Sequence, residues 1–189
     1  MVLHLGPLSR MTDADFFRFC QLNRDWRIER TSDGDLIVMP PASSDTGHRN
    51  FSLTGQLAAW SRTDETGLGF DSSAGFRLPN GATRSPDAAW IKRDRWDALS
   101  DDEKRAFAPL TPDFVVELRS RTDSLDVLRA KMREYIENGA RLGWLIDPMA
   151  RRVEVYRPGD EPVLIDQPAT IGADPVLPGF VLDLAEIFQ

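Results

Sequence analysis

FVVEL at residues 114–118 and LGWLI at residues 142–146 are two apolar runs. Strands with apolar residues on both faces lie centrally in sheets that are covered on both sides. Between the runs, apolar residues at 125, 128, 132, 135 and 136 follow the 3.6-residue period of a helix, and a glycine at 139 stands in the usual terminating place. The stretch therefore predicts a strand, a helix over residues 124–138 and a second strand, with the two strands parallel.

Shorter patterns on either side of this unit predict further helices and strands. Capping-box patterns at Thr12 and Ser100 predict a helix to about residue 22 and a short charged helix. A polar loop is expected over residues 42–47, followed by a helix over 48–61. Further strands are expected at residues 27–31, 36–39, 87–91, 153–156 and 163–165, with the first two and the last two forming hairpins.

The fold class expected from these elements is α/β, a mixed sheet flanked by helices. We expect one domain over residues 12–189, after an N-terminal extension at residues 1–11. A chain of 189 residues with 41% hydrophobic and 28% charged residues suits a single core.

The composition also narrows the class of protein. The sequence has no apolar run long enough to span a membrane, no basic N-terminal signal segment, and one cysteine, Cys20. An internal disulfide and a cysteine metal site are excluded, and a cytoplasmic location is favoured. The net charge of −7 argues against a general nucleic-acid-coating protein. It does not exclude an enzyme whose catalytic carboxylates are offset by bound metal.

Two acidic residues stand in apolar surroundings, Asp87 within SPDAAWI at 85–91 and Glu117 within the strand at 114–118. A buried carboxylate needs a metal, a cation or hydrogen-bond donors beside it. One interpretation is a structural salt bridge. The other is a site for Mg²⁺ or Mn²⁺, which prefer oxygen ligands and can activate water beside a phosphate.

Lys131 and Arg119 are the cations considered for such a site. Lys131 lies at the edge of the apolar stripe of its helix, so its ammonium group can reach along the sheet; from spacing alone, an exposed lysine at a helix edge is the better interpretation. Arg119 follows Glu117 by two residues and is expected on the same face of the strand, either in catalysis or as an ion-pair partner. Asp113 lies about 13 Å from Glu117 along the strand, so we expect Asp87 to meet Glu117 instead.

Pro86-Asp87 followed by Glu117-Leu118-Arg119 resembles the PD-(D/E)xK pattern of nucleases, with arginine in the lysine place. More specifically, the chain resembles the Uma2 (DUF820) family of endonucleases over almost its whole length. The matching segments are SPDAAWI at 85–91, PDFVVELRS at 112–120, KMREYIENG at 131–139, GWLIDP at 143–148, VEVYRPG at 153–159 and LPGFVLDL at 177–184.

The resemblance implies a restriction-endonuclease-like fold and assigns site residues. The lysine role is displaced from the strand to the following helix, which favours Lys131 over Arg119. Glu29 matches a family acidic residue and is a candidate third metal-site carboxylate, or else a solvent-facing strand residue. His48 matches a common family histidine that contacts phosphate or caps its helix, although a lone histidine is more often structural.

These residues together predict a Mg²⁺- or Mn²⁺-dependent endonuclease acting on nucleic acid, expected to be DNA. Asp87, Glu117 and Glu29 would hold the metal, Lys131 would act on water and phosphate, and two copies would pair to cut both strands. The alternative is a catalytically inactive nuclease-like fold that binds DNA or protein. A cofactor enzyme is disfavoured, because neither a glycine-rich phosphate loop nor a Ser/His/Asp signature is found.

Overall fold

The computed structural model describes residues 1–3 and 11–189 and confirms the mixed fold of helices and strands. Its helices are α1 (Asp13–Leu22), α2 (Ser44–Asp64), α3 (Arg93–Asp97), α4 (Asp101–Arg105) and α5 (Leu125–Glu137). Its strands are β1 (Val2–Leu3), β2 (Arg27–Arg30), β3 (Leu36–Met39), β4 (Gly67–Asp71), β5 (Phe76–Arg77), β6 (Thr83–Arg84), β7 (Ala88–Lys92), β8 (Phe114–Leu118), β9 (Leu142–Asp147), β10 (Arg152–Tyr156), β11 (Val163–Asp166), β12 (Thr170–Gly172) and β13 (Val181–Asp183).

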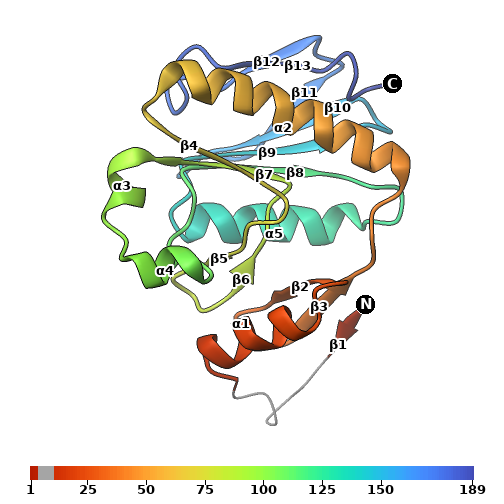
Figure 1. The fold of residues 1–189 in the computed structure, drawn as a ribbon. Coiled ribbons are helices and arrows are strands. Elements are labelled where there is room, and N and C mark those ends of the chain that lie inside the picture. Colours follow the sequence, from red (N-terminus) through yellow and green to blue (C-terminus); the bar gives the residue numbers. More distant parts are fainter. Residues whose placement is uncertain (4–10) are drawn as a thin grey trace.

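The central sheet is built around the strand–helix–strand unit at residues 114–146. Its strand order is β11-β10-β9-β8-β7-β4. β8 and β9 pair in parallel, as predicted for strands joined by a crossover helix, while the other neighbours pair antiparallel. In Figure 1, α2 covers one face of this sheet and α5 covers the other. β8 and β9 are consequently buried on both faces.

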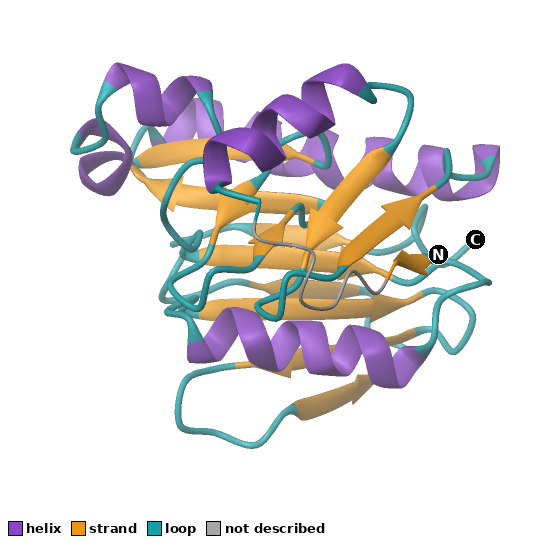
Figure 2. Cartoon of the chain, turned by 90° about the horizontal axis from the view of Figure 1, so that it is seen from below, coloured by secondary structure: helices purple, strands orange, loops and turns teal. Residues whose placement is uncertain are grey.

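The strands of residues 1–3 and 11–189 divide among three sheets rather than forming one. The predicted N-terminal hairpin of β2 and β3 belongs to a separate antiparallel sheet, ordered β1-β3-β2-β6-β5. Figure 2 shows the strands of this sheet running at an angle to those of the central sheet. A link at Arg30 and Thr83 joins β2 to β6, and such a pairing between distant segments leaves no local sequence pattern. β12 and β13 form a small third sheet.

The start of α2 corrects one prediction. Residues 42–47 were expected to be a loop, but the helix begins at Ser44. Ser43 is its N-cap, and its side-chain oxygen accepts a hydrogen bond from the backbone N–H of Thr46 at 3.3 Å. The polar residues that suggested a loop are the cap and first turn of the helix, where Asp45 also pairs with Arg49.

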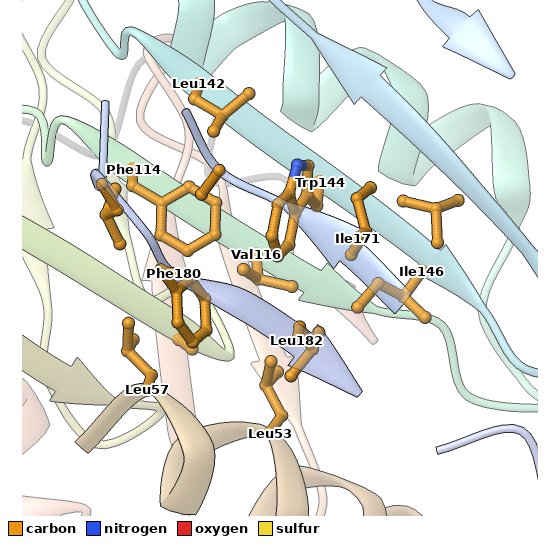
Figure 3. Packing of buried hydrophobic residues seen from close by; sticks show 14 of the residues in the cluster. Leu53, Leu57, Phe114, Val116, Leu142, Trp144, Ile146, Ile171, Phe180 and Leu182 are labelled. Carbon is orange, nitrogen blue, oxygen red and sulfur yellow. The ribbon is translucent and has the colours of Figure 1, made fainter. Parts of the chain in front are cut away.

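The largest hydrophobic core fills the space between α2, the central sheet and the β12–β13 sheet. Phe114 and Trp144 meet edge to face, with ring centroids 4.8 Å apart, and Phe180 packs on both. Leu53 and Leu57 of α2 close this core from the helix side (Figure 3). On the opposite face, Met132 and Tyr135 of α5 pack in a second core, leaving Glu117 beneath α5. No helix among the described residues has the length and apolar character needed to cross a bilayer.

Candidate active site: a buried carboxylate cluster

Strand pairing brings Asp87 beside Glu117. Ala88 of β7 lies opposite Val116 of β8, so one further step along the antiparallel pair places the two acids next to each other. The backbone N–H of Asp87 donates to the Val116 carbonyl at 2.9 Å, and Asp87 Oδ2 accepts from the Leu118 N–H at 2.8 Å. Both acids are buried. Main-chain hydrogen bonds therefore fix Asp87 beside the strand that carries Glu117, in the middle of a sheet.

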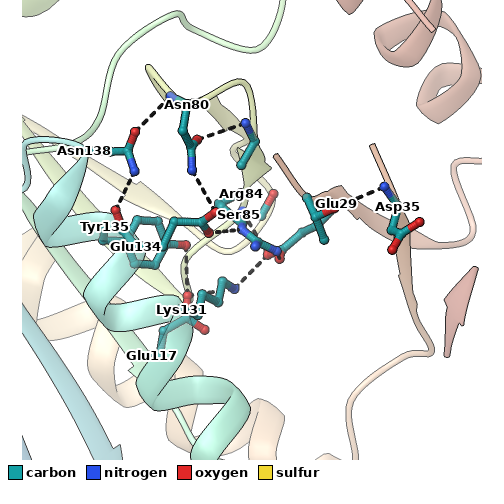
Figure 4. A network of polar contacts seen from close by, with 12 residues as sticks. Glu29, Asp35, Asn80, Arg84, Ser85, Glu117, Lys131, Glu134, Tyr135 and Asn138 are labelled. Atoms are coloured by element: carbon teal, nitrogen blue, oxygen red, sulfur yellow. Dashed lines mark hydrogen bonds and ion pairs between the residues drawn. The ribbon is translucent and has the colours of Figure 1, made fainter. Parts of the chain in front are cut away.

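Lys131 connects this pair to the second sheet. Its Nζ lies 2.8 Å from Glu117 Oε1 and 2.7 Å from Glu29 Oε1 (Figure 4). Its side chain is only 11% exposed. The interpretation of Lys131 as an exposed lysine at a helix edge is thus wrong, because two carboxylates hold the ammonium group under α5.

Glu29 projects from β2 and is fully buried. Besides Lys131, its Oε1 accepts from the Ser85 N–H at 3.0 Å, and its Oε2 pairs with Arg84 at 3.2 Å. Arg84 in turn pairs through Nε with Glu134 of α5 at 2.6 Å. The interpretation of Glu29 as a solvent-facing strand residue is wrong, and both of its oxygens already have cationic or N–H partners.

Burial and like charge act together on Glu117. Burial raises its pKa, Lys131 opposes that rise, and Asp87 and Glu29 add to it, so that the pKa is raised to about 7. Tyr135 donates its hydroxyl to Glu117 Oε1 at 3.0 Å. Burial lowers the pKa of Lys131, but Glu117 and Glu29 more than compensate, and the net shift is upward. The cluster therefore holds a charged ammonium beside a carboxylate that is protonated more readily than usual.

Sequence reasoning missed Arg27, which also contacts the cluster. Its NH1 lies 3.0 Å from Asp87 Oδ1, and its NH2 donates to the Ser85 carbonyl. Although burial lowers the pKa of Arg27, Asp87, Glu117 and Glu29 raise it overall. A signal was available, because Arg27 lies two residues before Glu29 and so projects from the same face of β2.

Other residues considered from sequence lie away from the cluster. Arg119 follows the end of β8 and pairs with Asp147 at 2.7 Å. His48 is exposed in α2, and among the described residues no hydrogen bond or ion pair joins it to the carboxylates. Asp113 accepts from the Lys92 N–H and from Arg95, each at 2.9 Å. The structure thus brings together Asp87, Glu117, Lys131 and Glu29.

Comparison with known proteins decides the family. The sequence profile of Uma2, described as "Putative restriction endonuclease", matches residues 13–185. The chain belongs to the Uma2 family. A solved structure from Anabaena variabilis ATCC 29413, titled as a "putative nuclease belonging to DUF820", is 18% identical with a TM-score of 0.75. The match covers 94% of this chain and 97% of that one, and at this identity it shows a shared fold. No curated protein matches.

Restriction-endonuclease-like proteins generally use divalent metals. Within residues 1–3 and 11–189, no three or more His, Cys, Asp or Glu side chains are grouped as a metal site. Asp87 and Glu117 nevertheless fit Mg²⁺, which is commonly bound through one or two carboxylates and keeps several waters. The raised pKa of Glu117 also reflects carboxylate repulsion that a cation would relieve. Glu29 fits less well, because its two oxygens pair with two cations, Lys131 and Arg84, whereas Asp87 pairs with one cation within the described residues.

A separate hollow of this Uma2 protein lies away from the cluster. A cavity of about 950 Å³ opens between α2 and β4 and is lined by residues such as Leu57, Gly69 and Arg93. It lies on the α2 face of the central sheet, whereas Glu117 faces α5. The carboxylate cluster remains the candidate active site, because burying its charged groups costs free energy, whereas the charges that line the hollow, such as Arg62, Glu65 and Asp71, are exposed.

Proposed function

We propose that this Uma2 protein is a Mg²⁺- or Mn²⁺-dependent endonuclease that hydrolyses phosphodiester bonds of DNA. The observation that carries the proposal is the buried Asp87–Glu117 pair with Lys131 Nζ 2.8 Å from Glu117. Carboxylates on neighbouring strands with an adjacent ammonium supply oxygen ligands for a cation and a positive group for a phosphate.

Each residue of the cluster has a role in this proposal. Asp87 and Glu117 would hold the divalent ion, which supplies a Lewis acid for the phosphate and lowers the pKa of its bound water. Lys131 stays protonated, so it orients water through its N–H donors and stabilises negative charge on the phosphate. Glu29 fixes Lys131 in this place through the 2.7 Å ion pair, with a contribution to the metal as its further proposed role.

Plasmid cleavage in Mg²⁺ or Mn²⁺ tests the proposal. Asp87→Asn and Glu117→Gln remove a charge with little change in shape, and we expect both to abolish cleavage that the wild type shows. Asp113→Asn is the matched control, because Asp113 is a buried acid beside the same strand with partners outside the cluster. Cleavage by Glu117→Gln equal to that of the wild type contradicts the assignment.

The second candidate function is a binding module that uses the nuclease-like fold without hydrolysis. The net charge of −7 and the engagement of Asp87 with Arg27 and of Glu117 with Lys131 favour it. Intact plasmid after incubation with metal, together with a retarded band in a gel-shift experiment, would support this module. Failure to bind DNA at all would favour a protein partner.

The cellular location and the oligomeric state are also part of the proposed function. We place the protein in the cytoplasm, in keeping with its single cysteine, Cys20. We also propose that two copies pair during double-strand cleavage, because one active site serves one strand. Sedimentation of the protein with and without duplex DNA measures this assembly.

A further inference from the structure

Arg27 lies on the accessible side of the carboxylate cluster. Its side chain is 29% exposed, against 10% for Asp87 and 11% for Lys131. Its strand, β2, also carries Glu29, which holds Lys131. β2 therefore positions Lys131 through Glu29 at the inner side of the cluster and presents Arg27 at the outer side, where a phosphate of a nucleic acid would arrive.

The guanidinium of Arg27 is incompletely used. NH1 and NH2 have partners, but Nε is buried and makes no hydrogen bond within the described residues. A buried donor without an acceptor is costly and needs an explanation. Arg129 shows the satisfied arrangement, since its Nε and NH2 both donate to the carboxylate of Glu154 at 2.6–3.1 Å. Arg27 thus keeps a free N–H beside the cluster.

Arg27 pairs with Asp87, a carboxylate that a metal ion would also need as a ligand. Asp87 Oδ1 accepts from Arg27, and Oδ2 accepts from the Leu118 N–H. A divalent cation on Asp87 and the guanidinium therefore compete for the same carboxylate. When the cation displaces Arg27, the guanidinium can present its N–H groups, Nε included, to a phosphate as a bidentate pair.

We propose that Arg27 is a phosphate-binding residue that rests on Asp87 in the metal-free protein and passes to a DNA phosphate when the cation binds. This inference rests on the proposed function. It assigns one side chain two opposite effects, because Arg27 opposes cation binding and favours DNA binding. A purely structural ion pair would favour both, since its loss would leave Asp87 misplaced.

Two binding measurements on Arg27→Gln test the inference without relying on activity. Calorimetric titration with Mn²⁺ in the absence of DNA measures cation affinity, and we expect it to rise several-fold. Fluorescence anisotropy with a random-sequence DNA duplex in Ca²⁺ measures phosphate contacts, and we expect affinity to fall about tenfold or more. The slope of log affinity against log salt should fall by about one.

Two further variants separate the roles of charge and shape. Arg27→Lys keeps the charge but loses the planar fork, so we expect weaker DNA binding with the salt slope kept. Arg129→Gln is the matched control, because Arg129 is 37% exposed and also pairs with a buried acid, Glu154. It should leave both affinities unchanged.

The outcomes separate this inference from the proposed function. Weaker Mn²⁺ and weaker DNA binding by Arg27→Gln would show a structural ion pair and overturn the inference. Unchanged DNA affinity and salt slope would overturn the phosphate contact. Either result leaves the proposed function intact if the wild type binds Mn²⁺. A wild type that binds no Mn²⁺ would instead overturn the proposed function, and the inference with it.

Discussion

The two faces of β8 differ in what they do for the protein. Toward α2, Phe114, Val116 and Leu118 pack in the main hydrophobic core. Toward α5, Val115 lies in the second core, but Glu117 places a carboxylate at the same depth. Residues of both faces are at most 3% exposed. Burial of the apolar face therefore stabilises the fold, whereas equal burial of the Glu117 carboxylate on the other face costs free energy.

On the charged face, ion pairs and hydrogen bonds, rather than apolar packing, offset the cost of burial. Removing a carboxylate from water costs several kcal/mol, which ion pairs and hydrogen bonds offset only in part. Lys131 and Tyr135 contact Glu117, yet its pKa remains raised to about 7. A protein selected for stability alone would place an apolar residue there, so the buried carboxylate makes this cluster the candidate functional site.

Phe114→Ala breaks the apolar face and should give the largest change in stability. Phe114 is fully buried against Trp144, and removing such a ring costs about 3–5 kcal/mol. Chemical denaturation measures the loss. Titration with Mn²⁺ under conditions where the variant stays folded should show wild-type affinity. Loss of metal affinity in the folded variant would mean that the two faces are not independent.

Glu117→Gln removes the charge from the other face and should stabilise the metal-free protein. Because burial raises the folded-state pKa above the ordinary value, the native state keeps a proton that the unfolded chain releases between about pH 4.5 and 7. Wild-type stability should therefore fall as pH rises through this window, while the variant does not share that fall.

The advantage of Glu117→Gln should grow to roughly 1–3 kcal/mol near pH 7. Denaturation at several pH values in the presence of a chelator measures it, with Asp113→Asn as the control acid. A variant less stable than the wild type at pH 7 would show that the ionised carboxylate stabilises the fold.

Tyr135→Phe should give the smallest change in stability and tests one hydrogen bond of the charged face. The variant keeps the ring in its core and removes the hydroxyl that donates to Glu117 Oε1. We expect a stability change of about 1 kcal/mol and a further rise in the pKa of Glu117, because an ionised carboxylate loses a donor. The pH midpoint of Mn²⁺ binding should move upward. An unmoved midpoint would mean that the hydroxyl only fills space.

Much of the fold follows from local patterns. β8, α5 and β9 were predicted because their apolar residues are close in sequence and have a clear period. The hairpin of β2 and β3 and the capping boxes at Thr12 and Ser100 were predicted for the same reason. The start of α2 was missed because Ser and Asp serve both loops and helix caps. The division into three sheets was missed because strand partners such as β2 and β6 are set by tertiary packing.

The candidate site was predictable from sequence where a charged residue stands within an apolar segment. A carboxylate in FVVEL or SPDAAWI is conspicuous in sequence, and the structure places Asp87 and Glu117 together. Spacing alone favoured an exposed Lys131, because the acids that bury it lie on other elements. Arg27 had no such contrast. Its one sequence signal was its place two residues before Glu29, while its contact with Asp87, 60 residues away, is set by the tertiary fold.

Calorimetric titration of wild type and Glu117→Gln with Mn²⁺ tests most directly whether the charged face of β8 is a cation site. We expect the wild type to bind the ion near pH 7 and to release protons, because a carboxylate with a pKa of about 7 must ionise to become a ligand. Glu117→Gln, folded and at least as stable, should lose this binding. Equal binding by the two proteins, or none by the wild type, would contradict a metal role for Glu117.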